Sequence, residues 1–335
     1  MTFQLTLTPA KRPTPANHEF VGLRMGLGLA TQALGAQQHL HAPVLGSADP
    51  IWLETWQCAD APQQGCTEGV HWRRSGALLY GTLELDEADF AATSARTPLQ
   101  AASETAYRRI FALLQSQGLP HLWRVWNYVA DINGDSAGLE RYRQFNIGRH
   151  DAFLACGQGG NDNVPAACAL GVRQGPLSIA FLAGAVPAVP IENPRQVSAY
   201  HYPRDYGPRA PTFSRAALVQ LSDAQEGLLV SGTASIVGHR TLHPGDVVEQ
   251  CHESMRNIEA VLQVANQRVR CTPFELSELV YRVYVRHASD HAAVQAALAP
   301  WLGTAEAVYV QADICRSDLL VEIEATALRT LETAA

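Results

Sequence analysis

The chain has 335 residues, of which 47% are hydrophobic and 17% are charged, and its formal net charge is −7 at pH 7. This composition is typical of a globular protein of about two domains and excludes long disordered regions. The negative charge disfavours nucleic-acid binding, which normally needs a basic face, and the lack of any run of 18 apolar residues argues against a membrane-spanning helix.

The chain begins with an extension, residues 1–48, in which we expect the Pro- and Thr-rich run 8–15 to be a mobile tail. After it, apolar or alternating runs predict strands, and apolar residues spaced three and four apart predict helices. The strands expected in the first half are 52–56, 78–85, 121–130, 167–172 and 177–183, and the expected helices are 98–117 and 136–153.

The second half carries the same patterns more clearly. Pro244 is expected to open a helix, because proline is favoured at the first helical position, and Asp290 is expected to cap another. The strands expected here are 216–221, 227–230, 279–286, 307–312 and 319–327, and the expected helices are 244–265 and 290–298.

The second half also repeats the element order of the first. At a constant offset of 148 residues, Ile110 and Leu114 of one long helix align with Ile258 and Leu262 of the other. We therefore predict an α+β fold made from an internally duplicated unit, with mixed sheets and helices on one face. The expected divisions are an extension at 1–48, a degenerate first unit at 49–185, a Pro-, Tyr- and Arg-rich connecting loop at 186–215 and a second unit at 216–330.

Two residue counts narrow the chemistry. The 25 basic residues are 24 arginines and Lys11, which lies in the expected tail, so reactions that need a buried lysine are disfavoured. The seven cysteines form no Cys-x-x-Cys motif, which argues against a disulfide framework or a zinc site and favours a reducing compartment. The cysteine pattern also leads us to expect a protein that uses no metal. The first 14 residues lack an export signal, so we expect the protein to be cytoplasmic.

Two segments combine arginine with aromatic residues. One is 141–149, RYRQFNIGR, and the other is the Pro-rich loop 200–215, which holds three tyrosines and three arginines. Arginine offers a two-pronged fork to a carboxylate, and tyrosine adds a hydroxyl donor and ring contact. The loop 200–215 therefore predicts a site for a planar ligand with several negative charges, and the segment 141–149 is a second candidate for contact with a ligand. The alternatives are a solvated helix face and a surface loop that tyrosines fix to the core.

A third segment places two carboxylates on one predicted strand. In Val321–Ala325, VEIEA, the side chains of Glu322 and Glu324 lie on the same face because strand residues alternate. Two carboxylates on one face of an apolar strand are costly unless one is protonated or paired. A buried, protonated glutamate is suited to general acid catalysis. A salt-bridged edge strand is the alternative.

Several segments of the chain resemble known protein families. VSGTASIVGH, HPGDVVEQCHESMRNIEAVL and VYVQADICRSDLLVEIEATA resemble the Rid (YjgF-like, chorismate-mutase-like) fold over about residues 216–330. WRVWNYVADIN, ERYRQFNIGRHDAF and QVSAYHYPRDYGPRAPTFSRA, together with CRSDLLVEIEA, are similar to the chorismatase family over about residues 50–330. Four segments in the right order make this second resemblance specific.

The resemblance implies release of pyruvate from chorismate without a metal or organic cofactor. It implies that Glu322 is the acid that protonates the enol ether. The residues expected to bind the two carboxylates of chorismate are Arg149, Arg209 and Arg215, with Tyr202 and Tyr206 as hydroxyl partners and Arg316 as a further candidate.

The product depends on what traps the cation formed after protonation. Cys315 and Ala234 correspond to positions that line the ring and separate the outcomes in the family. Cys315 resembles members that form 3- and 4-hydroxybenzoate, which supply pigment and ubiquinone synthesis. Hydrolysis to a dihydroxycyclohexadiene carboxylate is the alternative within the family.

Two other functions stay open. One is a Rid-type enamine/imine deaminase, and the other is a small-molecule binding or sensing protein without activity. Because Rid proteins are trimers with sites between subunits, an internal duplication can supply that interface within one chain. We therefore expect a monomer or weak homo-oligomer, with no nucleic-acid or membrane partner.

Overall fold

The computed structural model describes residues 2–9, 19–26, 35–58, 61–93, 96–158, 164–270 and 272–331. Lys11 and most of the expected tail 8–15 lie outside these ranges. Thr8 and Pro9 do not belong to a tail, because they end a strand that pairs with Ile51–Cys58 along its whole length.

The first half forms a seven-stranded mixed sheet covered by two helices. Helix α1 (Pro98–Gln117) starts at a capping box in which Thr97 and Gln100 bond each other's backbone, and it stops at Gly118, whose φ of 64° favours glycine. The strand order is β21 (Asp313–Ile314), β12 (Ala166–Val172), β9 (His121–Ala130), β13 (Leu177–Gly184), β8 (Leu78–Leu85), β7 (Val70–Ser75) and β6 (Gln63–Thr67). The second helix is α2 (Arg141–Ala155), preceded by the hairpin β10 (Asp135–Ser136) and β11 (Leu139–Glu140) and by the short helix η1 (Glu87–Asp89).

The second half forms another seven-stranded mixed sheet with two helices. Asp246 caps α3 (Val247–Asn266) by accepting from the backbone N–H of Glu249. The strand order is β14 (Val189–Ile191), β15 (Ala216–Ser222), β16 (Gln225–Thr233), β22 (Val321–Thr330), β19 (Val280–Val285), β20 (Ala307–Gln311) and β4 (Val44–Leu45). The remaining elements are α4 (His291–Leu302), the hairpin β17 (Ile236–Val237) and β18 (Arg240–Thr241), and the short helices η2 (Ala199–His201), η3 (Arg204–Tyr206), η4 (Leu276–Glu278) and η5 (Ala288–Asp290).

The predicted duplication is confirmed by the topology. The order β12-β9-β13-β8-β7 in the first sheet matches β20-β19-β22-β16-β15 in the second. In both sheets the first pair is parallel, as in β12–β9 and β19–β20, and the next pairs are antiparallel, as in β13–β9 and β22–β19. The chain therefore folds as two copies of one α+β unit.

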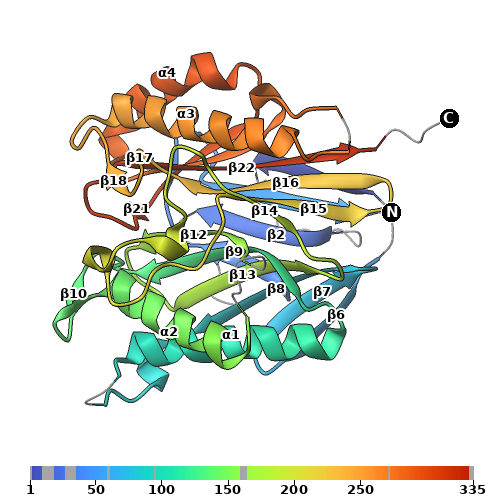
Figure 1. Cartoon of the computed structure of the whole chain (residues 1–335), viewed down its shortest axis with the longest axis vertical. Coiled ribbons are helices and arrows are strands. Elements are labelled where there is room, and N and C mark those ends of the chain that lie inside the picture. The colour runs from blue at the N-terminus through green and yellow to red at the C-terminus, as the bar shows by residue number, and fades with distance from the viewer. Residues whose placement is uncertain are drawn as a thin grey trace.

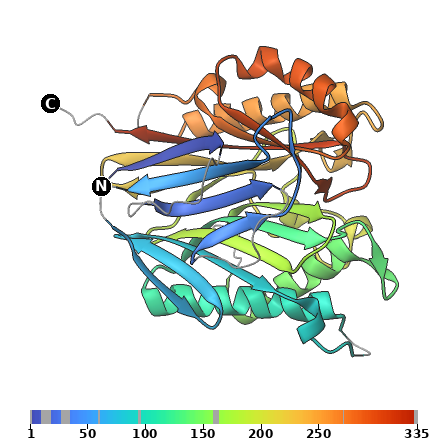
Figure 2. The same ribbon diagram turned by 180° about the vertical axis from the view of Figure 1, so that it is seen from behind.

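A third, four-stranded sheet comes mainly from the N-terminal segment. Its order is β1 (Phe3–Pro9), β5 (Ile51–Cys58), β2 (Glu19–Gly26) and β3 (Gln37–Leu40). Figure 2 shows these strands, coloured blue, between the two units. This small sheet packs against the inner faces of the two large sheets.

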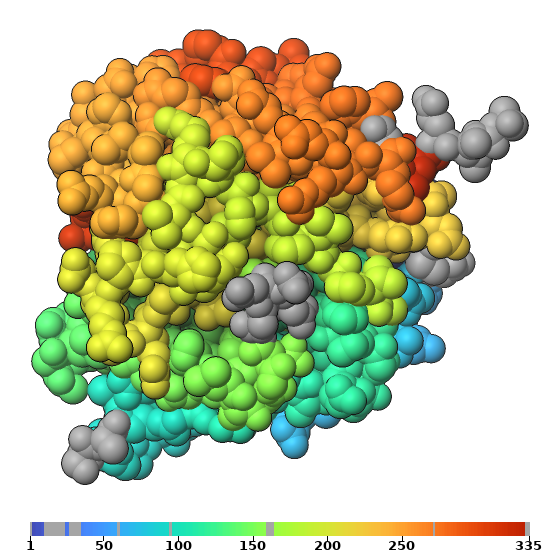
Figure 3. All heavy atoms as spheres, viewed as in Figure 1, coloured from blue at the N-terminus to red at the C-terminus, as the bar shows by residue number. Residues whose placement is uncertain are grey.

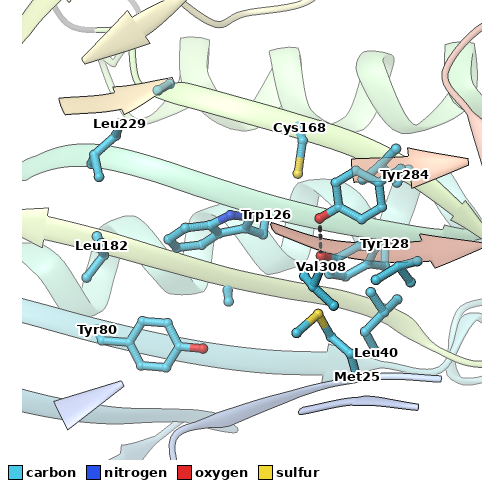
Figure 4. Close-up of a cluster of buried hydrophobic side chains, with 14 of the residues drawn as sticks. Met25, Leu40, Tyr80, Trp126, Tyr128, Cys168, Leu182, Leu229, Tyr284 and Val308 are labelled. Atoms are coloured by element: carbon cyan, nitrogen blue, oxygen red, sulfur yellow. Dashed lines mark hydrogen bonds between the residues drawn. The ribbon is translucent and has the colours of Figure 1, made fainter. Parts of the chain in front are cut away.

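The layers follow from where the apolar faces lie. Helices α1 and α2 cover the outer face of the first sheet, and α3 and α4 cover the outer face of the second (Figure 1). The inner faces of all three sheets share one core, in which the hydroxyls of Tyr128 and Tyr284 lie 2.8 Å apart (Figure 4). No helix in the described ranges is long and apolar enough to span a bilayer.

Several predicted boundaries differ from the structure. The expected strand 52–56 exists, but it belongs to the third sheet, and β7 takes its place in the first unit. The expected helix 136–153 begins only at Arg141, because residues 135–140 form a hairpin around Gly138, whose φ is 74°. Helix α3 begins three residues after Pro244, and α4 continues through Pro300 to Leu302.

Candidate active site

A cavity of about 270 Å³ lies at the boundary between the two units. The second unit supplies the end of β16, the start of β22 and the loop 315–318, and the first unit supplies the start of α2. The connecting loop 192–215 adds much of the remaining lining and runs across this boundary on the molecular surface (Figure 3). A pocket of about 30 Å³ adjoins the cavity and extends it toward β12.

Glu322 lines both spaces. It is the second residue of β22, it is 4% exposed, and among the described residues no hydrogen bond or ion pair reaches its carboxyl group. Burial and, to a smaller extent, the neighbouring Glu324 raise the pKa of Glu322 to about 8, against the opposite effect of Arg124 and Arg215. The structure thus places a neutral carboxylic acid at the wall of a cavity.

Gly232 of β16 leaves the space that this carboxyl group occupies. A Cβ atom at position 232 would overlap the Glu322 Oε1 atom and press on Cys168 of β12. The pairing of β16 with β22 shifts register between Val230 and Thr233, so the glycine lies in a bulge.

Glu324 lies two residues further along β22, on the same face, as the strand pattern predicted. Unlike Glu322 it is fully paired: it binds Arg124 of β9 and Arg282 of β19, and it accepts from the Tyr284 hydroxyl at 2.8 Å. The two glutamates of VEIEA therefore have opposite environments, one charged and paired and the other without a partner.

Arg215 and Arg316 form a cationic side of the cavity together with two tyrosines. The Arg215 Nη2 atom donates to the Tyr202 hydroxyl at 2.8 Å and to the Val197 carbonyl at 2.9 Å, while its buried Nε has no protein partner. Arg316 lies over the Tyr206 ring, 4.1 Å from its centroid, and 5.3 Å from that of Tyr202. The structure thus brings four of the predicted residues together.

Arg149 reaches the site from the other side. It lines the smaller pocket, it is 2% exposed, and its Nη2 donates to the Thr212 carbonyl at 2.6 Å. Its guanidinium packs over the rings of Tyr107 and Phe153. Its buried Nε has no protein partner, so one donor stays available in a largely apolar setting.

The structure does not bring Arg209 to either cavity. The residue is exposed in the connecting loop, after Gly207, whose φ is 135°. Its charge acts instead on His150 of α2, where it adds to the effect of burial in lowering the pKa of that imidazole. An expectation based on composition alone cannot tell an inward from an outward side chain on such a loop.

Cys315 and Ala234 both line the cavity beside Glu322. Burial raises the pKa of the Cys315 thiol to about 12, and the Glu322 carboxyl adds to this effect. The thiol therefore stays protonated at neutral pH and contributes a wall of defined size. The Ala234 carbonyl accepts from Asn257 of α3 at 3.1 Å, which fixes that segment.

Arg286 makes most of the side-chain hydrogen bonds that hold the loop carrying Cys315, and Gln250 of α3 bonds the backbone of Asp318 and Leu320. Arg286 donates to the carbonyls of Ile314, Arg316 and Leu319 at 3.1, 2.8 and 2.7 Å. Its Nη1 atom bonds the side chains of Asp313 and Asn133 at 2.7 and 3.1 Å. We did not predict this residue as part of the site.

Other site residues were missed as well. Tyr142 and Phe213 line both spaces, and Gln196 and Asp205 line the larger one. Arg124 and Arg282 pair with Glu324. Arg124 and Arg282 could have been found from the sequence, because each is a lone arginine inside an apolar strand, where an unpaired charge is costly and a buried partner is expected.

The described residues contain no group of three or more His, Cys, Asp or Glu side chains placed to hold a metal ion. What they do place together is a neutral carboxylic acid, buried cationic groups on two sides and a mixed polar and aromatic wall. This arrangement is suited to binding a small dianion and protonating it.

Comparison with known proteins identifies the family. Residues 54–183 match the family model described as chorismatase FkbO/Hyg5-like, N-terminal, and residues 209–329 match that described as endoribonuclease L-PSP. A 3-hydroxybenzoate synthase of Streptomyces hygroscopicus is 38% identical over 298 residues, 84% of this chain and 82% of that protein. A chorismatase of Streptomyces rapamycinicus is 38% identical over 283 residues, 82% of each chain.

A solved structure agrees with these matches. The crystal structure of a chorismatase aligns with a TM-score of 0.85 and 31% identity, covering 97% of this chain and 98% of the other. Sequence, both units of the fold and their arrangement thus agree along nearly the whole length. This chain belongs to the chorismatase family.

Proposed function

We propose that this protein cleaves the enolpyruvyl ether of chorismate, releasing pyruvate and leaving 3-hydroxybenzoate, 4-hydroxybenzoate or both. The observation that carries the proposal is the unpaired, buried Glu322 at the wall of a cavity with arginines on two sides. The names of the relatives, 3-hydroxybenzoate synthase and chorismatase, support the same activity.

Binding is the first step that the site supports. Chorismate has a ring carboxylate and an enolpyruvyl carboxylate, and Arg215 with Arg316 on one side and Arg149 on the other offer a fork to each. Tyr202 and Tyr206 add hydroxyl groups on the first side. The unpartnered Nε atoms of Arg215 and Arg149 are donors that a bound carboxylate satisfies.

Protonation follows. Glu322 donates its proton to the methylene carbon of the enol ether, which leaves an oxocarbenium ion and a Glu322 carboxylate beside it. Carbon is a slow base, so the acid must be positioned and still protonated near neutral pH, which a pKa of about 8 allows. Positioned acid catalysis contributes roughly 10²–10⁴-fold, and binding in a productive geometry contributes further acceleration.

The fate of the cation decides the product. Addition of water to the oxocarbenium carbon, with cleavage of its bond to the ring oxygen, gives pyruvate and a dihydroxycyclohexadiene carboxylate. Cleavage of the ring C–O bond instead releases pyruvate, and attack on that ring carbon by the neighbouring hydroxyl, or loss of a ring proton, then gives a hydroxybenzoate; the proton lost returns to the Glu322 carboxylate, and no water is taken up. We propose that Cys315 and Ala234, which line the cavity beside Glu322, set this outcome. We further propose a cytoplasmic enzyme without cofactor whose hydroxybenzoates supply pigment or quinone synthesis.

The test is an incubation of purified protein with chorismate in metal-free buffer. Pyruvate is measured with lactate dehydrogenase and the ring products by chromatography. We expect pyruvate and hydroxybenzoate in equal amounts. Glu322→Gln should abolish pyruvate release and leave chorismate binding, measured by calorimetry, nearly unchanged.

Each other result has a definite meaning. Pyruvate with a non-aromatic diol keeps the activity and overturns the hydroxybenzoate assignment. Full turnover by Glu322→Gln removes this residue as the acid. No pyruvate from folded wild-type protein contradicts the proposed reaction.

A further inference from the structure

A buried ionic network lies directly beside the proposed acid. Glu324 binds Arg124 and Arg282, and Arg282 also binds Glu54 of β5. These four residues are between 2 and 8% exposed. Each of the three sheets contributes, because Arg124 comes from β9 in the first, Arg282 and Glu324 come from the second, and Glu54 comes from the third.

The network is neutral, since its two guanidinium groups balance its two carboxylates. Its hydrogen bonds extend to Tyr284, which donates to Glu324 and accepts from Arg282 at 3.0 Å. Glu322 lies two residues away on the same face of β22 and takes no part in it. The carboxyl group that matters for catalysis is thus the one that the network leaves out.

Arg124 is the cation that this arrangement withholds from Glu322. It donates through Nη2 to Glu324, while its buried Nη1 has no partner among the described residues. The Arg124 guanidinium can therefore pair with Glu324 or with Glu322, and the two glutamates compete for this one cation.

The other groups that face Glu322 do not take over this role. Arg215 of the connecting loop is the second cation that acts on Glu322; its Nη2 is held by Tyr202 and Val197, and we assign its unpartnered Nε to the substrate carboxylate. Arg149 lines the smaller pocket and donates to the Thr212 carbonyl, and Arg316 lines the larger cavity and donates to the His239 carbonyl. The carboxylates that line the larger cavity are those of Glu140, Asp205 and Asp318.

The remaining titratable neighbours stay uncharged. They come from α2, β12, β19 and the loop before β22, and burial raises the pKa of each of them: Tyr142, Cys168, Tyr284 and Cys315. Arg124 and Glu324 are therefore the pair that decides whether Glu322 has a cationic partner.

We propose that Glu324 is a positioning residue, which holds the Arg124 guanidinium in its own ion pair so that Glu322 keeps its proton for the substrate. This inference rests on the proposed function, because it concerns the acid of that reaction. Loss of the Glu324 charge acts on Glu322 twice in the same direction: it removes a like charge and it frees a cation. Both changes favour the ionised form of Glu322, which cannot donate a proton.

The test is the pH dependence of kcat/KM in four proteins: wild type, Glu324→Gln, Arg124→Gln and the double variant. The alkaline limb of this profile reports the ionisation of the acid in the free enzyme. In Glu324→Gln the limb should move to lower pH by about one unit or more, as an opposite charge within a few ångströms produces. At a pH above the alkaline limb, a shift of one unit lowers kcat/KM about tenfold relative to the wild type.

The second substitution distinguishes this role from a structural one. Adding Arg124→Gln to Glu324→Gln should move the limb back toward higher pH, because the freed cation is gone. A merely structural defect would be worsened by the second loss. Arg124→Gln alone should move the limb upward, and this variant decides the matter if Glu324→Gln does not fold.

Glu226→Gln is the matched control. Glu226 is a buried glutamate of β16 that pairs with Arg270 and is not in the lining of either cavity, so its substitution should leave the limb in place. Two results overturn the inference. One is an alkaline limb of kcat/KM that stays at the wild-type pH in folded Glu324→Gln, and the other is a limb that stays in place or moves to lower pH in Arg124→Gln. Full activity of Glu322→Gln overturns the acid assignment itself, whatever the limbs do.

Discussion

At the scale of single residues, the site depends on keeping one carboxyl group protonated inside a folded protein. The pKa of the Glu322 carboxyl group is about 8 in the folded protein, whereas the ordinary pKa of a glutamate is 4.5. Between these two pH values the folded state binds one proton more than the unfolded state does. The free energy of unfolding must therefore fall as the pH rises through this window. The stabilising contribution of the Glu322 proton is fully present only below pH 4.5.

This cost predicts a stabilising substitution. In Glu322→Gln the free energy of unfolding should exceed that of the wild type, and the difference should grow by about 1.4 kcal/mol per pH unit between pH 5 and 8. Urea unfolding at three pH values in this range measures it. Contributions of other titrating groups cancel in the difference, so a gap that stays constant with pH would contradict the high pKa.

The two arginines of the connecting loop predict different kinetics. Arg215→Ala removes a charge-assisted fork and should raise KM by roughly tenfold or more, because such bonds contribute about 1.5–3 kcal/mol. Arg209→Ala, on the exposed part of the same loop, is the control and should leave KM unchanged. Steady-state kinetics of both variants, with a melting temperature to verify folding, decide the question; an equal rise in both would put Arg209 in the site.

At the scale of elements, the loop between β21 and β22 is held by two side chains, Arg286 and Gln250. Arg286 holds the backbone of residues 314–319 through three carbonyls and also bonds Asn133 in the other unit. Lysine keeps the charge but lacks the planar fork, so it cannot make these bonds together. The loop position, and with it the place of the Cys315 side chain, should become less defined.

Arg286→Lys should therefore change the ratio of ring products more than it changes total pyruvate. Chromatography of the products beside the pyruvate assay measures both quantities. Cys315→Ala provides the reference, because it removes the wall itself and should alter the same ratio. If Arg286→Lys lowers pyruvate severely and leaves the ratio intact, the arginine serves stability and does not control the product.

The sequence patterns predict elements well where burial is strictly periodic. The bounds expected for α1 and β9 agree with the structure at both ends. β7 was missed because its half-exposed residues, VHWRRS, show neither alternation nor an apolar run. The hairpin before α2 was read as helix because short turn-rich strands carry no periodic signal.

The site could be predicted only in part, for a similar reason. Glu322, Arg215, Arg316 and the tyrosines lie in segments with unusual local composition, so they could be found. Arg124 pairs with Glu324, 200 residues away in the sequence, and only the packing of two sheets brings them together. Sequence spacing alone carries no information on such a pair.

At the scale of the whole molecule, both units build the site. Arg149, Tyr142 and Cys168 come from the first unit, and Glu322 comes from the second. One chain thus supplies all the residues that we assign to catalysis and binding. We expect a monomer, or an oligomer whose contacts are not needed for activity.

Dilution tests this expectation. Activity per mole of chain should stay constant from micromolar to nanomolar protein, while light scattering reports the mass at the upper concentration. A loss of specific activity on dilution, with a half-point that follows an association equilibrium, would mean that a second chain completes the site.

The duplicated topology has one more consequence, which concerns the division of labour between the copies. Glu322 is paired across the sheet with Tyr284, and at the matching place in the first unit Ser178 is paired with Tyr128. Two residues on, Glu324 is matched by Ala180. The first copy has thus no acid and no ion-pair acceptor there, and it contributes cationic groups, Arg149 and Arg124, in their place. The duplicated fold thus carries the acid in one copy alone, so a tight-binding dianionic analogue of the substrate should titrate one site per chain.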